Sequence, residues 1–231
     1  EAALIRLLNK PVRIAAAGRT DAGVHATGQV VSLDVPVRWT PHELRRALNA
    51  VLPEDVWVSA SAAADPDFHA RFSAIARGYV YRIGTADITA SPFLRHRCWP
   101  MRQALPLDAM NDAASRLVGE HSFLAFAKAG QPERGDRCTV HRSDWRPWRT
   151  YGLEYHVVAN RFLHHMVRYL VGTMVDAARG RRPIDEIDAL LRGTTDLETS
   201  PPAPGEGLYL SRVYYSPAEI QEESLDETVP G

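Results

Sequence analysis

The chain of 231 residues is poor in cysteine and lysine and has no long apolar run. Cys98 and Cys138 are far apart and lack the spacing of metal-binding pairs. Free thiols in a reducing compartment are therefore favoured over a disulfide scaffold. No apolar stretch approaches the roughly 18 residues of a membrane-spanning helix, and the first residues do not resemble a secretory signal. We therefore expect a cytoplasmic protein that does not enter a membrane.

The scarcity of lysine makes arginine the main cation of the chain. Lys10 and Lys128 are the only lysines, and the other 25 of the 27 basic residues are arginines. Residues 1–182 carry a formal charge of +8 and residues 183–231 a charge of -9. Arginine suits phosphate and base contacts, so a basic body favours a polyanionic partner. Two alternatives remain open: codon usage explains the arginines, and the acidic end only aids solubility.

The apolar periodicity predicts an α+β fold with mainly antiparallel sheets, because strand pairs stand between helices. Helical spacing covers residues 1–10, 40–52, 106–120, 161–180 and 183–193. Strand patterns cover residues 12–17, 28–37, 55–63, 76–85, 152–160 and 208–215. The order of elements recurs approximately in the two parts of the chain. We therefore expect an N-terminal half over residues 1–73 and a C-terminal half over residues 74–231.

The string GRTDAGVHA, residues 18–26, follows the first predicted strand and places charged residues between glycines. An aspartate beside glycine in a turn usually makes only a local hydrogen bond. Here Asp21 has Arg19 and His25 close by on a loop that leaves a strand, where catalytic groups concentrate. Asp21 is therefore a candidate general base, metal ligand or nucleophile.

Two further positions carry possible chemistry. Arg168 lies opposite the apolar stripe of the helix predicted over residues 161–180, so it is either solvated or lines a cleft with a carboxylate partner. Tyr79 stands near Arg71 and Arg77, an interleaving typical of proteins that stack single-stranded bases beside phosphate contacts. The competing interpretation of Tyr79 is an aromatic residue of the core.

No metal site is expected from the sequence. His164 and His165 are adjacent in a predicted helix, where neighbouring side chains diverge by about 100° and cannot both face one ion. A metal-dependent nuclease that used Asp21 and Asp34 would need clustered carboxylates, which the sequence does not provide.

The string GRTDAGVH, residues 18–25, resembles the signature of the tRNA pseudouridine synthase A family. Later stretches are similar to further blocks of that family and follow in the same order: residues 67–74 (DFHARFSA), 117–126 (LVGEHSFLAF), 160–172 (NRFLHHMVRYLVG) and 205–213 (GEGLYLSRV). The resemblance therefore covers nearly the whole chain.

The resemblance implies a role for each matching residue. It makes Asp21 the catalytic nucleophile, with Arg168 as the helix arginine that pairs with this carboxylate. It makes Tyr79 the residue that packs against the target uracil. Substrate-binding positions implied in the same way are Arg19, which holds the flipped RNA, and His25, Arg71, Arg77 and Leu208.

The resemblance also implies the reaction and its requirements. The family isomerises uridine to pseudouridine in the anticodon stem-loop of tRNA, at positions 38 to 40, without cofactor or metal and as a homodimer. Its pseudouridine synthase fold has two halves that flank a central cleft. The carboxylate attacks the sugar, assists formation of a glycal, or adds to the base; the residues leave these routes open. The alternative function is a non-catalytic protein that binds tRNA or helps it to fold.

One departure concerns the start of the chain. The family opens with a strand that carries a Tyr-Asp-Gly-like segment and a Gly-Trp-Gln motif, whereas this sequence begins with the helix that follows. We expect the absence of that strand to leave backbone groups and apolar surface of the sheet uncovered.

Overall fold

The computed structural model describes residues 1–128, 135–193 and 196–225, and these form two compact units. The smaller unit contains residues 1–19 and 30–74, and the larger unit contains residues 20–29 and the chain from residue 75 onward. The segment 20–29 thus belongs to the larger unit, whereas the sequence analysis includes it in the N-terminal half. Its strand β2 (His25–Ala26) pairs with β9 (Leu208–Tyr214) of the larger unit, which explains the difference.

The smaller unit packs two helices beside a two-stranded sheet. Its elements are α1 (Ala2–Leu8), β1 (Ala15–Ala16), β3 (Val31–Ser32) and α2 (Pro41–Asn49), with β1 and β3 antiparallel. Leu4, Leu8, Val12 and Leu44 form its buried core. The N-terminus of α2 has a capping box, since the Thr40 hydroxyl accepts from the Glu43 N–H and the Glu43 carboxylate accepts from the Thr40 N–H.

The strand predicted over residues 55–63 is wrong. This segment has no strand partner, and its backbone bonds to side chains of α2 instead. Asn49 donates to the Val58 carbonyl at 2.9 Å and accepts from the Val58 N–H at 2.8 Å. Arg45 donates to the Ser59 carbonyl at 2.9 Å. Because these side chains satisfy the backbone groups, the extended segment needs no ladder.

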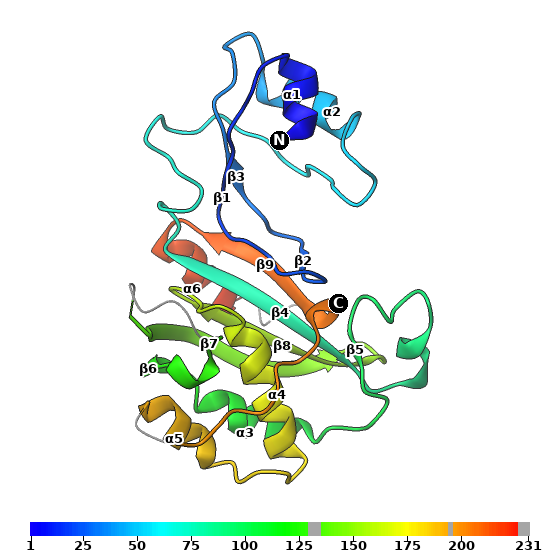
Figure 1. The fold of residues 1–231 in the computed structure, drawn as a ribbon, viewed down its shortest axis with the longest axis vertical. Coiled ribbons are helices and arrows are strands. Elements are labelled where there is room, and N and C mark those ends of the chain that lie inside the picture. Colours follow the sequence, from blue (N-terminus) through cyan, green and yellow to red (C-terminus); the bar gives the residue numbers. More distant parts are fainter. Residues whose placement is uncertain (129–134, 194–195, 226–231) are drawn as a thin grey trace. The chain divides into compact units, whose positions relative to one another are not determined.

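The larger unit is built on a seven-stranded, mostly antiparallel sheet (Figure 1). The strands not yet named are β4 (Ala76–Gly84), β5 (Trp99–Pro100), β6 (Gly119–Ser122), β7 (Arg137–Trp148) and β8 (Gly152–Ala159). Their order is β2-β9-β4-β8-β7-β6, with β5 beside β4. The two parallel pairs are β2 with β9 and β4 with β5. The α+β class with mainly antiparallel sheets is therefore confirmed.

Helices cover both faces of this sheet. The helices α3 (Leu107–Ser115), α4 (Met166–Ala178) and α5 (Glu186–Arg192) lie together on one face (Figure 1). On the other face, α6 (Pro217–Leu225) contributes Ile220 to a small cluster with Ala76, Val158 and Tyr214. Val157 and Val158 of β8 belong to different clusters because successive strand residues point to opposite faces.

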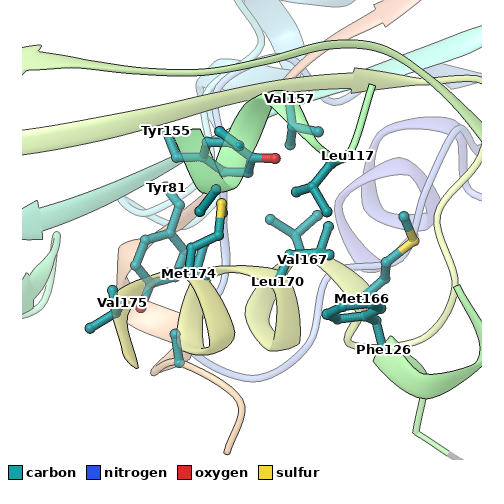
Figure 2. Close-up of a cluster of buried hydrophobic side chains, with 14 of the residues drawn as sticks. Tyr81, Leu117, Phe126, Tyr155, Val157, Met166, Val167, Leu170, Met174 and Val175 are labelled. Carbon is teal, nitrogen blue, oxygen red and sulfur yellow. The ribbon is translucent and has the colours of Figure 1, made fainter. Parts of the chain in front are cut away.

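The main core lies between the sheet and α4. Figure 2 shows Tyr81, Tyr155 and Val157 of the strands against Leu170 and Met174 of α4. Tyr81 and Ile83 are fully buried and Tyr79 packs against the same cluster, so these alternate residues of β4 face the core. Across the described part of the chain, none of the helices has the length and apolarity needed to span a bilayer.

Candidate active site

Asp21 lies in a tight turn that is fixed to the edge of the sheet in the larger unit. The Val24 N–H donates to the Asp21 carbonyl at 3.0 Å, and Gly23 has a φ of +80°. A type II turn requires such a positive φ at its third residue, where glycine is favoured. Just after the turn, β2 pairs with β9. Gly205 packs against the other side of the turn. A Cβ at this position would lie 2.8 Å from the Ala22 carbonyl oxygen.

The turn before α4 provides the polar partners of Asp21. The helix begins at Met166, and His165 has a left-handed φ of 63°, so the helix predicted from residue 161 starts later. His164 and His165 therefore do not diverge as helical neighbours do. Their ring centroids are only 4.1 Å apart, and the argument that they cannot face one point is wrong.

Both imidazoles contact the Asp21 carboxylate. His165 Nε2 lies 3.0 Å from Oδ2, and His164 Nε2 lies 3.5 Å from Oδ1. The side chain of His165 is 17% exposed, compared with 34% for Asp21 and 42% for His164. Burial lowers the pKa of His165 and outweighs the opposing effect of the Asp21 charge. The lowered pKa favours the neutral imidazole at pH 7, with its Nε2 in contact with the carboxylate.

Tyr79 lies within electrostatic reach of Asp21. Burial raises the pKa of the Tyr79 phenol, the nearby Arg77 lowers it, and the Asp21 charge raises it further. The ring meets Phe162 edge to face, with centroids 4.9 Å apart. Tyr79 is thus a neutral phenol on the core-facing side of β4, with its ring held by an aromatic contact.

Arg168 of α4 is held by the segment that precedes β9. Its Nε donates to the Ala203 carbonyl at 2.7 Å, and the Ala203 N–H donates to the Arg168 carbonyl at 2.9 Å. Among the described residues, the side chains in contact with the Asp21 carboxylate are the two histidines, not Arg168. The expected pairing of Arg168 with Asp21 is therefore not present in this structure. Its charge still reaches the site, since it helps to lower the pKa of His165.

Three other predicted positions lie in the same unit. His25 stacks on Tyr209 at 4.7 Å, and its Nε2 lies 2.8 Å from the His96 carbonyl oxygen. Leu208 is buried in the main core, opposite Tyr81 across the β9–β4 ladder. The strand β4 contains both Arg77 and Tyr79. His25 on β2 and Leu208 on β9 thus lie in the two paired strands next to the turn that contains Asp21.

Arg19 and Arg71 belong to the smaller unit. Both are exposed, and the Arg71 guanidinium lies 5.7 Å from the centroid of the Phe72 ring. Arg19 precedes Asp21 by two residues, so the chain itself keeps these two near each other. The structure therefore groups Asp21, Tyr79, Arg168, His25, Arg77 and Leu208 in one unit.

The sequence analysis does not identify His164 and His165 as partners of Asp21. The signal available was the His-His pair just before an apolar stripe, because histidine is one of the residues that adopts the left-handed conformation more often than most. The ligating atoms of Asp21, His164 and His165 all lie within 4.8 Å of one another. Of the side chains in the described ranges, these form the group able to hold a metal ion.

Comparison with known proteins connects this site to a family. The family model described as tRNA pseudouridine synthase matches residues 1–73 and 113–216. The tRNA pseudouridine synthase A of Geobacillus kaustophilus is 42% identical, over 88% of this chain and 78% of the relative. The proteins of the same name from Bacillus subtilis and Caulobacter vibrioides are 36% and 41% identical, over 88% and 93% of this chain and 82% and 87% of theirs. The chain belongs to the tRNA pseudouridine synthase family.

Proposed function

We propose that Asp21 is the nucleophile with which this isomerase converts uridine to pseudouridine in tRNA, at positions 38 to 40 of the anticodon stem-loop. The observation that carries the proposal is a carboxylate on a tight turn, in contact with two imidazoles and near the half-buried Tyr79. A turn fixed to the sheet edge gives the carboxylate a defined direction, as a reacting group requires.

The reaction rearranges bonds without oxidation or hydrolysis. The bond between N1 of uracil and C1′ of the ribose breaks, the base turns, and a bond from C5 to C1′ forms. C5 loses its proton and N1 gains one, so neither a redox cofactor nor an added water is needed. An ionised carboxylate serves in each route considered, whether it attacks the sugar, assists a glycal or adds to the base.

The surroundings of Asp21 suit this role. His165 Nε2 lies 3.0 Å from one carboxylate oxygen, and Arg168 adds positive charge near that histidine. Tyr79 offers a neutral aromatic ring against which the detached uracil can stack until it reattaches. A base taken out of a helical stack loses a few kcal/mol of stacking, and contacts from Arg19, Arg71 and Arg77 to the RNA backbone offset this loss.

The proposal is tested by release of tritium from tRNA labelled at C5 of uridine. We expect the wild type to release tritium and Asp21→Asn to lose the activity by on the order of 10³-fold or more. Asp34→Asn is the matched control, because Asp34 is an exposed carboxylate of the smaller unit, and it should react like the wild type. Equal tRNA binding with no release by the wild type would instead favour a non-catalytic tRNA-binding protein.

The proposal includes a cytoplasmic homodimer. Cys98 and Cys138 are both buried and unpaired, as is usual for proteins of a reducing compartment. Sedimentation velocity of the purified protein measures the oligomeric state directly, and a concentration-independent monomer would contradict the dimer.

A further inference from the structure

Asp21, His164 and His165 together have the chemistry of a metal-binding site. They offer one carboxylate oxygen and two imidazole nitrogens from a single small region of the larger unit. Two histidines and one carboxylate are a common ligand set for Zn²⁺ and related divalent ions when a further position stays open.

The spacing of the ligand atoms fits a transition metal. Zinc lies about 2.0–2.1 Å from histidine nitrogen and about 2.0–2.2 Å from carboxylate oxygen, so tetrahedral ligand atoms are about 3.3 Å apart. The two N···O separations, 3.0 Å from His165 and 3.5 Å from His164, bracket that value. The ligating atoms of the three residues all lie within 4.8 Å of one another, so rotation of the side chains would bring them to the spacing that one ion requires.

The backbone determines this convergence. Because His165 has a φ of 63° and precedes the first residue of α4, both imidazoles lie against the same carboxylate. The exposed fractions of Asp21 and His164 leave the far side of the site open to solvent. An ion bound here would thus complete its coordination with water, while His165, the more buried of the two histidines, lies on the protein side of the site.

The positive charges near the cluster limit how tightly it can bind a divalent cation. Arg168 and Lys128 add positive charge near His165, and the cluster supplies only one carboxylate. We therefore expect reversible, micromolar binding rather than the tight binding of a structural zinc site.

We propose that a divalent transition-metal ion, with Zn²⁺ as the probe, binds between Asp21, His164 and His165 and thereby inhibits the enzyme. A bound ion would occupy the carboxylate oxygens that face the RNA, so metal and substrate would exclude each other. The binding half of this proposal stands on the geometry alone, whereas the inhibition half rests on the proposed function of Asp21.

Binding is measured without RNA, by calorimetric titration of Zn²⁺ into the metal-free chain without a histidine tag. Co²⁺ absorption in the visible range reports the coordination geometry of the same site. We expect one ion per chain, with the dissociation constant raised about tenfold or more in His165→Gln and in His164→Gln. His141→Gln is the matched control, since His141 is an exposed histidine of β7 outside the cluster, and it should bind like the wild type.

Each outcome decides one half of the proposal. Absence of saturable binding, or equal affinity in His165→Gln and His141→Gln, would overturn the metal site. Inhibition of tritium release at Zn²⁺ concentrations near the measured dissociation constant, reversed by chelator, would support the second half. Zinc bound at the cluster without effect on tritium release would overturn it. A chain without activity in the absence of zinc would contradict the proposed function and leave the binding result unaffected.

Discussion

At the scale of single residues, the position of His165 explains how an accessible carboxylate is held in one orientation. Asp21 is about one-third exposed, and its two oxygens face different imidazoles. His165 makes the shorter contact and is the more buried of the two, so it restricts the Asp21 side chain most. Its role in the proposed mechanism is to position the carboxylate, while Asp21 itself reacts.

We predict that His165→Ala lowers kcat for tritium release about 10- to 100-fold and changes KM for tRNA little. His165 Nε2 lies 3.0 Å from the carboxylate; a hydrogen bond to a charged group, if this contact forms one with substrate bound, contributes about 1.5–3 kcal/mol, and each 1.36 kcal/mol corresponds to about tenfold in rate. Single-turnover and steady-state kinetics separate the two constants. His141→Ala serves as the control, and a loss confined to KM would contradict a positioning role.

The residue roles differ in how far the sequence alone could predict them. The signature around Asp21 is local, so the candidate carboxylate follows directly from the string GRTDAGVHA. The contact with His164 and His165 depends on a left-handed backbone at one residue and on packing between segments far apart in the chain. Apolar periodicity reports neither a left-handed residue nor packing between distant segments. The sequence pattern therefore predicts a helix that includes both histidines.

At the scale of elements, the segment before β9 is packed so closely on α4 that one glycine is required. A Cβ at Gly172 would lie 2.1 Å from the Pro201 carbonyl oxygen. The same segment bonds Ala203 to Arg168 in both directions and accepts a hydrogen bond from the Tyr81 hydroxyl through the Pro204 carbonyl. The position of Arg168 therefore depends on this close approach.

We predict that Gly172→Ala destabilises the fold by about 1–3 kcal/mol, although alanine in a helix interior is ordinarily favoured over glycine by up to about 1 kcal/mol. Urea unfolding measures the loss, and kcat should fall because the segment that orients Arg168 is displaced. Gly180→Ala is an instructive control, because Gly180 has a φ of +67° but open space around it. It should lower stability and leave kcat unchanged.

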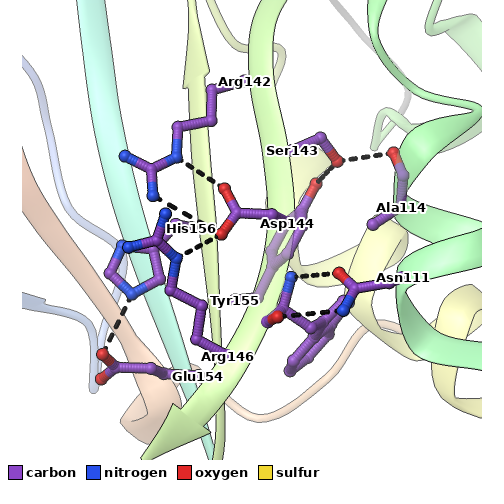
Figure 3. Close-up of polar contacts among 10 residues, drawn as sticks. Asn111, Ala114, Arg142, Ser143, Asp144, Arg146, Glu154, Tyr155 and His156 are labelled. Atoms are coloured by element: carbon purple, nitrogen blue, oxygen red, sulfur yellow. Dashed lines mark hydrogen bonds and ion pairs between the residues drawn. The ribbon is translucent and has the colours of Figure 1, made fainter. Parts of the chain in front are cut away.

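On the face of the sheet opposite the main core, charged side chains line the neighbouring strands β7 and β8. Figure 3 shows Asp144 of β7 between Arg142 and Arg146, both of which donate to it at 2.6 Å, and His156 of β8 beside Glu154 at 3.0 Å. Burial alone would raise the pKa of Asp144, but the hydrogen bonds and charges of the two arginines outweigh it and the pKa is lowered.

We predict that Asp144→Asn lowers the free energy of unfolding by about 1.5–3 kcal/mol at pH 7. Since the folded-state pKa lies below the unperturbed value of about 3.9, the contribution of the carboxylate is complete above that value and is lost as the pH falls through the folded pKa. Urea midpoints at pH 7 and pH 3 should therefore converge for wild type and variant. Asp196→Asn, at an exposed position, provides the control.

The elements themselves were predictable to different degrees. The strands β4, β8 and β9 and the helix α2 follow from alternation, apolar content and a capping box, all of which are local signals. The strand β7 is not predicted, because its outer face holds arginines and aspartate that only the neighbouring strands make favourable. At the free edge of β7, the Asn111 side chain of α3 accepts a hydrogen bond from the Trp145 N–H at 2.8 Å and donates one to the Trp145 carbonyl at 3.1 Å (Figure 3). Apolar periodicity cannot predict such a tertiary contact.

At the scale of the whole molecule, the separation of charge along the chain bears on how an RNA would bind. Residues 1–182 carry a net charge of +8 and the remaining residues a net charge of -9, so the excess of each sign lies in a different part of the sequence. Binding of a polyanion through the basic part releases counterions from the RNA, which makes the affinity fall steeply with salt. The acidic residues of the C-terminal part bring the net charge of the chain to -1, which limits unspecific association with nucleic acid.

We predict that the logarithm of tRNA affinity falls linearly with the logarithm of salt concentration, and that Arg19→Gln and Arg71→Gln each reduce the slope by about 0.7–0.9, the contribution of one phosphate contact. Both arginines are exposed and belong to the basic part of the chain. Arg192→Gln is the matched control, because Arg192 is exposed but stands in the acidic part, and its slope should equal that of the wild type. Fluorescence anisotropy with labelled tRNA gives these slopes. An equal change of slope for Arg192→Gln and Arg71→Gln would mean that the RNA responds to net charge alone. An unchanged slope with lower affinity would assign the arginine to base stacking instead of phosphate binding.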